Sequence, residues 1–326
     1  MAMTLVEASK LSNDVLQKGV IELLVKNDPI LSRIQWKDIR GNGLTYDVET
    51  TLSGAAFYNV GDTWDESTSV VTQHTANTAI LGGDADVDEF LATTRSNMQD
   101  LMGEQIQAKT KAIRRTFNDA FLYGYKTGGG TDAKKFDGLH YLLSDATYNS
   151  VALTTSSGTP KLLNLSKLEE AVDMVKNGEP DVILMTKMMR RYINVFLNGV
   201  GGLTKADVQG KTVQTLFDIP IVVSDHLSDS ESCIGLYGST YGHNWTDGTA
   251  LADNDSSTSI FVLQFAPYAT CGIQSGGPIR VKRFRDELET KNAKRVRLVW
   301  YPGVMQQSII ACSKVTGVDP DGVVAA

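Results

Sequence analysis

The longest amphipathic stretch of the chain covers residues 86–125 and predicts one long helix. Its apolar side chains recur at intervals of three and four, which places them on one helical face. Asp84 or Asp86 would accept hydrogen bonds from the free N–H groups at its start. A helix of about 40 residues would be about 60 Å long, so other elements have to pack along it. The apolar positions are Val87, Phe90, Leu91, Met98, Leu101, Met102, Ile106, Ile113, Phe117, Ala120 and Phe121.

The N-terminal segment, residues 1–40, has the pattern of a helix followed by an extended stretch. Thr4 and Glu7 form a capping box, and Asp28–Pro29 ends the helix. Residues 30–40 are expected to be extended. The polar face mixes acids with few lysines, which favours packing on protein over binding to a membrane surface.

Residues 41–82 predict two antiparallel strands joined by a long tip over residues 53–67. Leu44, Tyr46 and Val48 alternate with polar neighbours, as do parts of residues 70–80. A two-stranded ribbon is marginally stable alone in water, so we expect it to lie against another chain. The segment has no lysine or arginine, and its acids are Asp47, Glu49, Asp62, Asp65 and Glu66.

Alternating helix and strand signals predict a compact domain at about residues 160–275. Ser166 and Glu169 form a second capping box, whose helix would end at Gly178. Thr186 would start another helix. Apolar runs at residues 181–185, 219–223, 233–237 and 260–265 predict strands.

The last part of the chain returns to strands, with alternation over residues 279–284 and 295–300. The apolar run 304–312 is expected to be a central strand. These strands need an apolar partner, and we expect them to pack on the long helix. The predicted fold class is therefore α+β.

Composition excludes several classes of protein. The 326 residues are 42% hydrophobic and carry a net charge of −7, which disfavours a sequence-reading DNA binder. No apolar run approaches the roughly 18 residues of a membrane span, and the N-terminus lacks the apolar core of a signal peptide. Cys233, Cys271 and Cys312 are expected to be buried free thiols.

Motifs for catalysis are weak throughout the sequence. Gly210-Lys211-Thr212 resembles the end of a phosphate-binding loop, but Lys205 stands where the first glycine is needed. The four histidines are scattered without metal-ligand spacing. Asp225–His226 suggests an acid–base pair, although a solvated loop is favoured there. We therefore predict no catalytic, cofactor-binding or metal-binding residues.

A basic cluster lies near the C-terminal end. It permits three interpretations: contact with nucleic-acid phosphates, a solvated strand face, or ion pairs with the acidic ribbon of a neighbouring subunit. The third is favoured, because the ribbon has acids and no bases of its own. The cluster comprises Arg280, Lys282, Arg283, Arg285, Arg295 and Arg297.

Four local strings are similar to the major capsid proteins of tailed bacteriophages, which have the HK97-like fold. They are Phe117-Asn118-Asp119-Ala120, Phe136-Asp137-Gly138-Leu139, the run at residues 216–225, and Trp300-Tyr301-Pro302-Gly303-Val304. The order of parts also resembles this family over nearly the whole chain.

This resemblance implies a division of the chain into named parts. They are an N-terminal arm (1–40), an extended loop (41–82), a peripheral domain with a spine helix (83–160), an axial domain (161–275) and return strands of the peripheral domain (276–326).

The resemblance also implies a function and partners. Subunits would form hexamers and pentamers of an icosahedral shell that encloses double-stranded DNA without sequence-specific binding. A portal, a separate scaffold protein and decoration proteins would be the partners, with assembly in the host cytoplasm. A lysine-to-asparagine crosslink from the ribbon is not expected, because the ribbon has no lysine. The alternatives are an encapsulin-like compartment shell and an α/β enzyme using residues 160–275.

Overall fold

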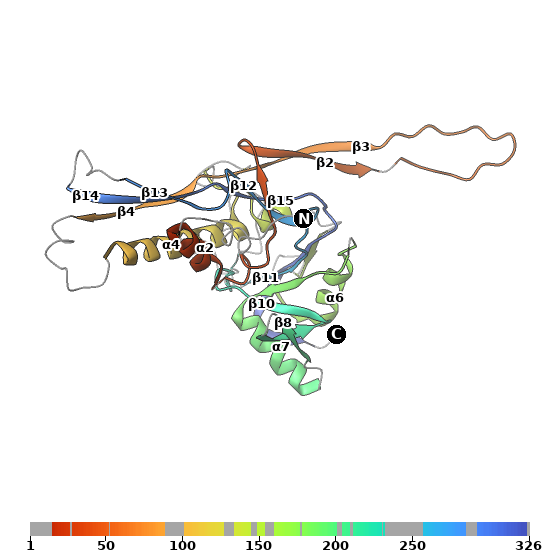
Figure 1. Cartoon of the computed structure of the whole chain (residues 1–326). Coiled ribbons are helices and arrows are strands. Elements are labelled where there is room, and N and C mark those ends of the chain that lie inside the picture. Colours follow the sequence, from red (N-terminus) through yellow and green to blue (C-terminus); the bar gives the residue numbers. More distant parts are fainter. Residues whose placement is uncertain are drawn as a thin grey trace.

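Figure 1 shows a computed structural model of the chain. It describes residues 15–26, 28–51, 53–88, 101–126, 134–144, 149–153, 160–176, 178–200, 204–208, 211–229, 231, 257–284 and 292–324. In this part of the chain, no helix is both long enough and apolar enough to cross a membrane.

A long hairpin is the most extended feature of the molecule, and it projects away from the body (Figure 1). Strand β2 (Gly43–Thr51) pairs antiparallel with β3 (Val70–Asn77). Gly43 pairs with Asn77 at its base, and Thr51 pairs with Val70 at its outer end. The two strands predicted from the alternation are thus confirmed.

A three-stranded sheet and two helices form an elongated region of the body (Figure 1). The strand order is β13-β14-β4, and helix α4 packs on β4 and β14 while α2 packs on α4. Buried Ile113 of α4 joins Ala85 and Val296 of the sheet in one core. The elements are α2 (Val15–Lys26), β4 (Leu81–Asp88), α4 (Leu101–Tyr123), β13 (Arg280–Arg283) and β14 (Ala293–Trp300).

The predicted long helix is shorter in the structure, because its first residues form β4 instead. All eight residues of β4 pair with β14, and this pairing satisfies backbone groups that a helix would have bonded internally. Asp84 and Asp86 are therefore strand residues, and the prediction that either caps a helix is wrong. Residues 89–100 lie outside the described residues.

A small sheet connects this elongated region, the hairpin and the rest of the body. Its order is β1-β12-β15, with β1 parallel to β12 and β12 antiparallel to β15. The expected strand at residues 304–312 is only partly present, because β15 ends at Gln306 and a turn precedes β16. The strands are β1 (Trp36–Ile39), β12 (Thr270–Ser275) and β15 (Pro302–Gln306).

An eight-stranded mixed sheet forms the second region, with the order β5-β16-β11-β7-β10-β9-β8 and β6 paired to β16. Helices α6 and α7 pack against β16. Residues 233–237, predicted as a strand, lie outside the described residues. The elements are β5 (Ser150–Ala152), β6 (Lys161–Asn164), α6 (Leu165–Asp173), β7 (Val182–Met185), α7 (Lys187–Val200), β8 (Thr204–Val208), β9 (Lys211–Leu216), β10 (Ile219–Val223), β11 (Thr258–Leu263) and β16 (Ser313–Val324).

Several predicted helix boundaries shift by a few residues. Helix α6 starts one position before Ser166, because the Asn164 side chain accepts a hydrogen bond from Ser166 N at 2.8 Å and acts as the cap. It ends at Asp173, earlier than the predicted Gly178. Helix α7 begins after Thr186, as predicted, and Thr186 Oγ1 accepts from Met189 N at 3.3 Å.

The N-terminal arm is only partly extended. After α2, Asp28 Oδ1 accepts from the backbone N–H groups of Ile30 and Leu31, which holds a turn where extended chain was expected. Extended backbone begins at Trp36 with β1. The capping box of Thr4 and Glu7 lies outside the described residues.

The short segment around Gly138 packs tightly against the end of α4. A Cβ on Gly138 would lie 2.6 Å from Ala120 O and 2.7 Å from Gly124 N, which are backbone atoms that cannot give way. The segment leads into the short helix α5 (Leu139–Leu142), whose Leu139 is fully buried.

We expect Gly138→Ala to lower the free energy of unfolding by about 2 kcal/mol, as overpacked sites do. Chemical denaturation followed by circular dichroism measures this change. Gly19→Ala in α2 is the matched control, because nothing lies within 4 Å of a Cβ there. The control should raise stability slightly, since alanine favours helix over glycine. Equal stability of the two variants would contradict the close packing at Gly138.

Candidate assembly surfaces

The base of the hairpin is anchored in the body. Leu44, Tyr46 and Ala76 pack against a small core around Ile273 and Met305. Burial raises the pKa of Tyr46 to about 12. The hairpin is therefore fixed at one end, while β3 is exposed along most of its length.

The tip of the hairpin, residues 53–69, is held in one shape by local contacts. The rings of Tyr58 and Trp64 stack with their centroids 4.6 Å apart. Asn59 N donates to Asp62 Oδ2 at 2.6 Å, and Gly61 supplies the positive φ of +98° that this turn needs. The tip is thus preorganised before any partner is present.

The tip exposes large apolar side chains to solvent. Phe57 and Val60 are each 108% exposed and Trp64 is 78% exposed. Grouped exposed apolar side chains of this kind mark surfaces that contact another protein.

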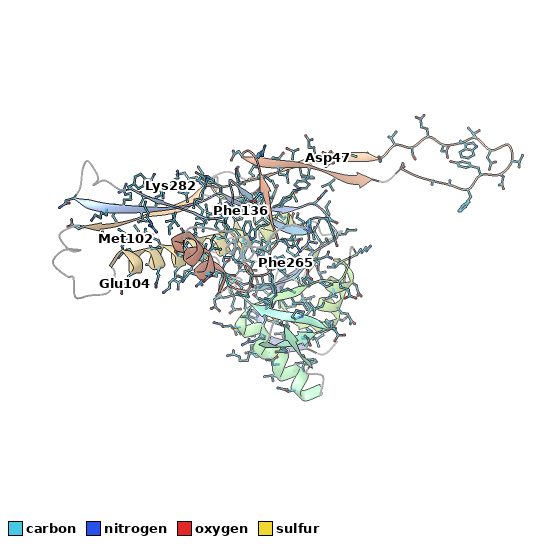
Figure 2. The ribbon with its side chains drawn as sticks, in the orientation of Figure 1. Asp47, Met102, Glu104, Phe136, Phe265 and Lys282 are labelled. Carbon is cyan, nitrogen blue, oxygen red and sulfur yellow. The ribbon has the colours of Figure 1, made fainter. Side chains whose placement is uncertain are left out.

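The predicted acids lie along the same hairpin. Asp47 (labelled in Figure 2) accepts from Gln73 Nε2 at 3.3 Å, and Glu49 lies opposite Val71 in the strand register. Asp62, Asp65 and Glu66 are exposed at the tip. Across the described part of the chain, no ion pair joins Asp47, Asp62, Asp65 or Glu66 to the predicted arginines.

Arg295 and Arg297 have carboxylate partners within the chain. Arg295 donates to both oxygens of Asp86 at 2.7 and 2.6 Å. Arg297 donates to both oxygens of Asp84 at 2.6 and 2.8 Å, and this hydrogen bonding lowers the pKa of Asp84. The carboxylates of Asp84 and Asp86 already compensate the charge of both arginines. Arg295 and Arg297 therefore offer less positive charge to a neighbouring subunit.

The remaining arginines lie at or beyond β13. Arg280 Cζ lies 5.3 Å from the centre of the Tyr301 ring, while Arg283 is exposed at the end of the strand. Arg285 lies outside the described residues.

The structure separates the sequence pair Asp225–His226. Asp225 Oδ1 pairs with Lys187 Nζ at 2.6 Å, whereas His226 Nδ1 lies 2.7 Å from Asp119 Oδ1. Both pairs lie on a cleft of about 550 Å³ between α4, α7 and the turn after α2. Sequence reasoning missed this cleft, because its residues come from segments far apart in the chain.

Sequence reasoning also missed a buried polar network. Glu231 is 6% exposed and accepts from the hydroxyls of Tyr123 and Ser259. Burial would raise the pKa of Glu231, but these bonds and His140, whose Nε2 lies 3.4 Å away, hold it below the usual value. The network ties the end of α4 to β11, which indicates a structural role.

Lys314 of β16 completes this network. Lys314 is 1% exposed, and its Nζ donates to the backbone oxygen of His140 at 2.8 Å. Burial lowers the pKa of Lys314 to about 8, although Glu231 opposes the shift.

Within the described residues, no cluster of three His, Cys, Asp or Glu side chains is arranged to hold a metal ion.

Solved structures of viral and cellular shells share this fold. The encapsulin of the holo-SrpI complex from Synechococcus elongatus PCC 7942 is 13% identical, with 100% of this chain and 99% of that chain covered and a TM-score of 0.64. The capsid of a native GTA particle is 13% identical over 88% and 89% of the chains, with a TM-score of 0.57. A structure of Mycobacterium phage Bobi is 11% identical over 87% and 88%, with a TM-score of 0.55.

The sequence comparisons point to one family. No curated protein sequence matches the chain. The family model of the SU10 major capsid protein matches residues 44–231, which is more than half of the chain. With the shared fold, this match confirms the resemblance noted in the sequence: the chain belongs to the SU10 major capsid protein family and has the HK97-like capsid fold.

Proposed function

We propose that the chain assembles into hexamers and pentamers of an icosahedral shell that encloses double-stranded DNA. The hairpin carries this proposal, because it extends a preorganised apolar and acidic tip beyond the body of its own subunit. A subunit with such an extension buries it by contact with a second subunit, and association then adds to stability.

The five parts expected from the sequence form the proposed organisation of the subunit. Pairing of β4 with β14 supports grouping the first return strands with residues 83–160 in a peripheral domain, whereas β16, at the end of the chain, lies in the mixed sheet beside β11. The mixed sheet around β7, β10 and β11 supports an axial domain at residues 161–275. The arm (1–40) and the extended loop (41–82) complete the division.

The proposed contact joins the hairpin acids of one subunit to the arginines of the next. Because Arg295 and Arg297 already face carboxylates, we expect these two arginines to receive less of the neighbour's acidic charge. The ten proposed contact residues are Asp47, Glu49, Asp62, Asp65, Glu66, Arg280, Arg283, Arg285, Arg295 and Arg297.

The proposed role is structural and not enzymatic. A net charge of −7 suits a container whose DNA is moved in and out, because a wall that gripped phosphates would oppose that movement. A portal, a separate scaffold and decoration proteins are the proposed partners, and the host cytoplasm is the proposed place of assembly.

We expect that replacing residues 52–69 with an Asn-Gly turn, which joins the paired residues Thr51 and Val70 directly, abolishes assembly and preserves the subunit fold. The replacement removes the exposed tip but keeps β2 and β3, and Asn-Gly closes a two-residue hairpin well. Light scattering and negative-stain imaging measure assembly, and circular dichroism measures folding.

Val195→Ala is the matched control for this experiment. It removes an apolar side chain that is 65% exposed on α7, away from the hairpin. The control should assemble normally. Shells or capsomers from the chain without its tip would contradict the proposal, as would a monomeric unaltered chain under all assembly conditions.

A cellular compartment shell is the second candidate, since the Synechococcus encapsulin structure covers the whole chain. The contents of particles purified from the native source separate the two functions. Nuclease-protected double-stranded DNA would support a phage capsid, whereas a single enclosed enzyme without DNA would support the compartment.

A further inference from the structure

The cleft beside α4 has a floor of buried polar side chains. Asp28 is 4% exposed and Asn118 is 3% exposed. Asn118 Nδ2 donates to Asp28 Oδ2, while Asp28 Oδ1 accepts from Ile30 N and Leu31 N. These bonds orient the amide of Asn118, and its Oδ1 is a buried acceptor without a hydrogen-bond partner among the described residues.

The rim of the cleft is basic. Arg114 and Arg115 come from α4, and Arg190 comes from the first turn of α7. Lys187 and His226 already face Asp225 and Asp119, respectively. In contrast, the three arginines form no ion pair within the described part of the chain. The first turn of α7 adds positive partial charge to the same rim.

These groups select a ligand with two properties. The arginines need oxyanions, and Asn118 Oδ1 needs a hydrogen-bond donor. An acidic peptide supplies both, because its carboxylates pair with guanidinium groups and its backbone N–H groups donate. The phosphate backbone of duplex DNA has acceptors only, and a rigid duplex does not enter a concave cleft of about 550 Å³.

The cleft lies on the face of α4 that is turned away from the sheet β13-β14-β4. Ile113 and Phe117 are buried, and Arg115 is two residues from each. At about 100° per residue, Arg115 points to the opposite side of the helix. The hairpin, by contrast, continues directly into β4 and emerges on the sheet side (Figure 1).

We propose that this cleft is the docking site for an acidic peptide segment of a separate partner protein. The inference rests on the proposed function, because a shell one subunit thick would carry the hairpins on one face and the clefts on the other. A hairpin tip from a second copy would therefore lie on the wrong face, although its charge is suitable.

The test measures fluorescence polarisation of a labelled ten-residue peptide of alternating glutamate and serine on the full chain. Arg190→Glu should weaken binding at least tenfold, because it replaces an attraction with a repulsion. Arg191→Glu is the matched control: it makes the same charge change one residue along α7, where Arg191 stacks over Tyr192 at 5.3 Å outside the cleft. The control should change affinity less than threefold.

Arg114→Glu provides a second variant on α4 and should have the same effect as Arg190→Glu. Added salt should weaken binding in the unaltered chain, because exposed charges are screened. Equal losses from Arg190→Glu and Arg191→Glu would overturn the site, and so would equal binding of a peptide with glutamine in place of glutamate.

Two competitors test the identity of the occupant. Displacement by a short DNA duplex at equal concentration would assign the cleft to nucleic acid and overturn the proposal. Tighter binding of a peptide with residues 57–67 of this chain would assign it to a second copy. Imaging of shells is scored separately, so a failure of assembly is distinguishable from a failure of peptide binding.

Discussion

Phe117→Ala is expected to lower the free energy of unfolding by about 4 kcal/mol, as large-to-small changes at buried aromatic residues do. Phe117 is 0% exposed on α4. Its ring centroid lies 5.0 Å from that of Trp300 and 5.7 Å from those of Trp36 and Phe136. Three other segments of the chain therefore meet on this ring, and none can collapse into the cavity without disturbing the others.

Urea denaturation of unassembled subunits, followed by tryptophan fluorescence, measures this loss. Phe57→Ala is the matched control, because the Phe57 ring is fully exposed at the hairpin tip. The control should change subunit stability by less than about 0.5 kcal/mol. A loss below about 1 kcal/mol for Phe117→Ala would show that the aromatic cluster does not support the fold.

Lys314 is expected to make subunit stability rise with pH by about 3 kcal/mol between pH 8 and pH 10.5. Burial lowers its pKa from 10.5 to about 8 in the folded chain. In this window the unfolded chain binds the proton and the folded chain does not, so raising the pH favours folding. Each unit of difference in pKa corresponds to about 1.4 kcal/mol.

The measurement compares the unaltered chain with Lys314→Met over this pH range. Other groups act in the opposite direction: burial raises the pKa of Cys271 to about 11 and that of Tyr46 to about 12. Both chains share those groups, so the difference between the two stability curves isolates Lys314. Parallel curves would mean that Lys314 is charged and solvated in the folded chain.

Local pattern was sufficient to predict many elements. Alternation predicted β2 and β3, since each strand has one face toward the protein at its base and one toward solvent. Continuous apolar runs predicted β7 and β10, which are buried between helices and other strands. The absence of lysine and arginine from residues 41–82 marked the acidic hairpin as a candidate contact surface.

The helix–strand boundary near Asp84 could not be predicted from local pattern. Apolar residues at intervals of three and four continue through residues 86–125, which favours helix. Pairing with β14 overrides that preference, and β14 lies about 200 residues further along the chain: Asp84 and Arg297 are 213 positions apart. Local periodicity contains no information about which distant strand is available.

The two candidate surfaces also differ in how far the sequence alone predicts them, for the same reason. The acids of the hairpin lie within one short segment of the sequence, so composition alone determined that this segment carries acidic side chains and no lysine or arginine. The cleft joins Asp28 to Asn118, 90 positions away, and to the arginines of two helices. Only the tertiary structure decided this grouping, because burial and hydrogen bonding between distant segments depend on how the elements pack.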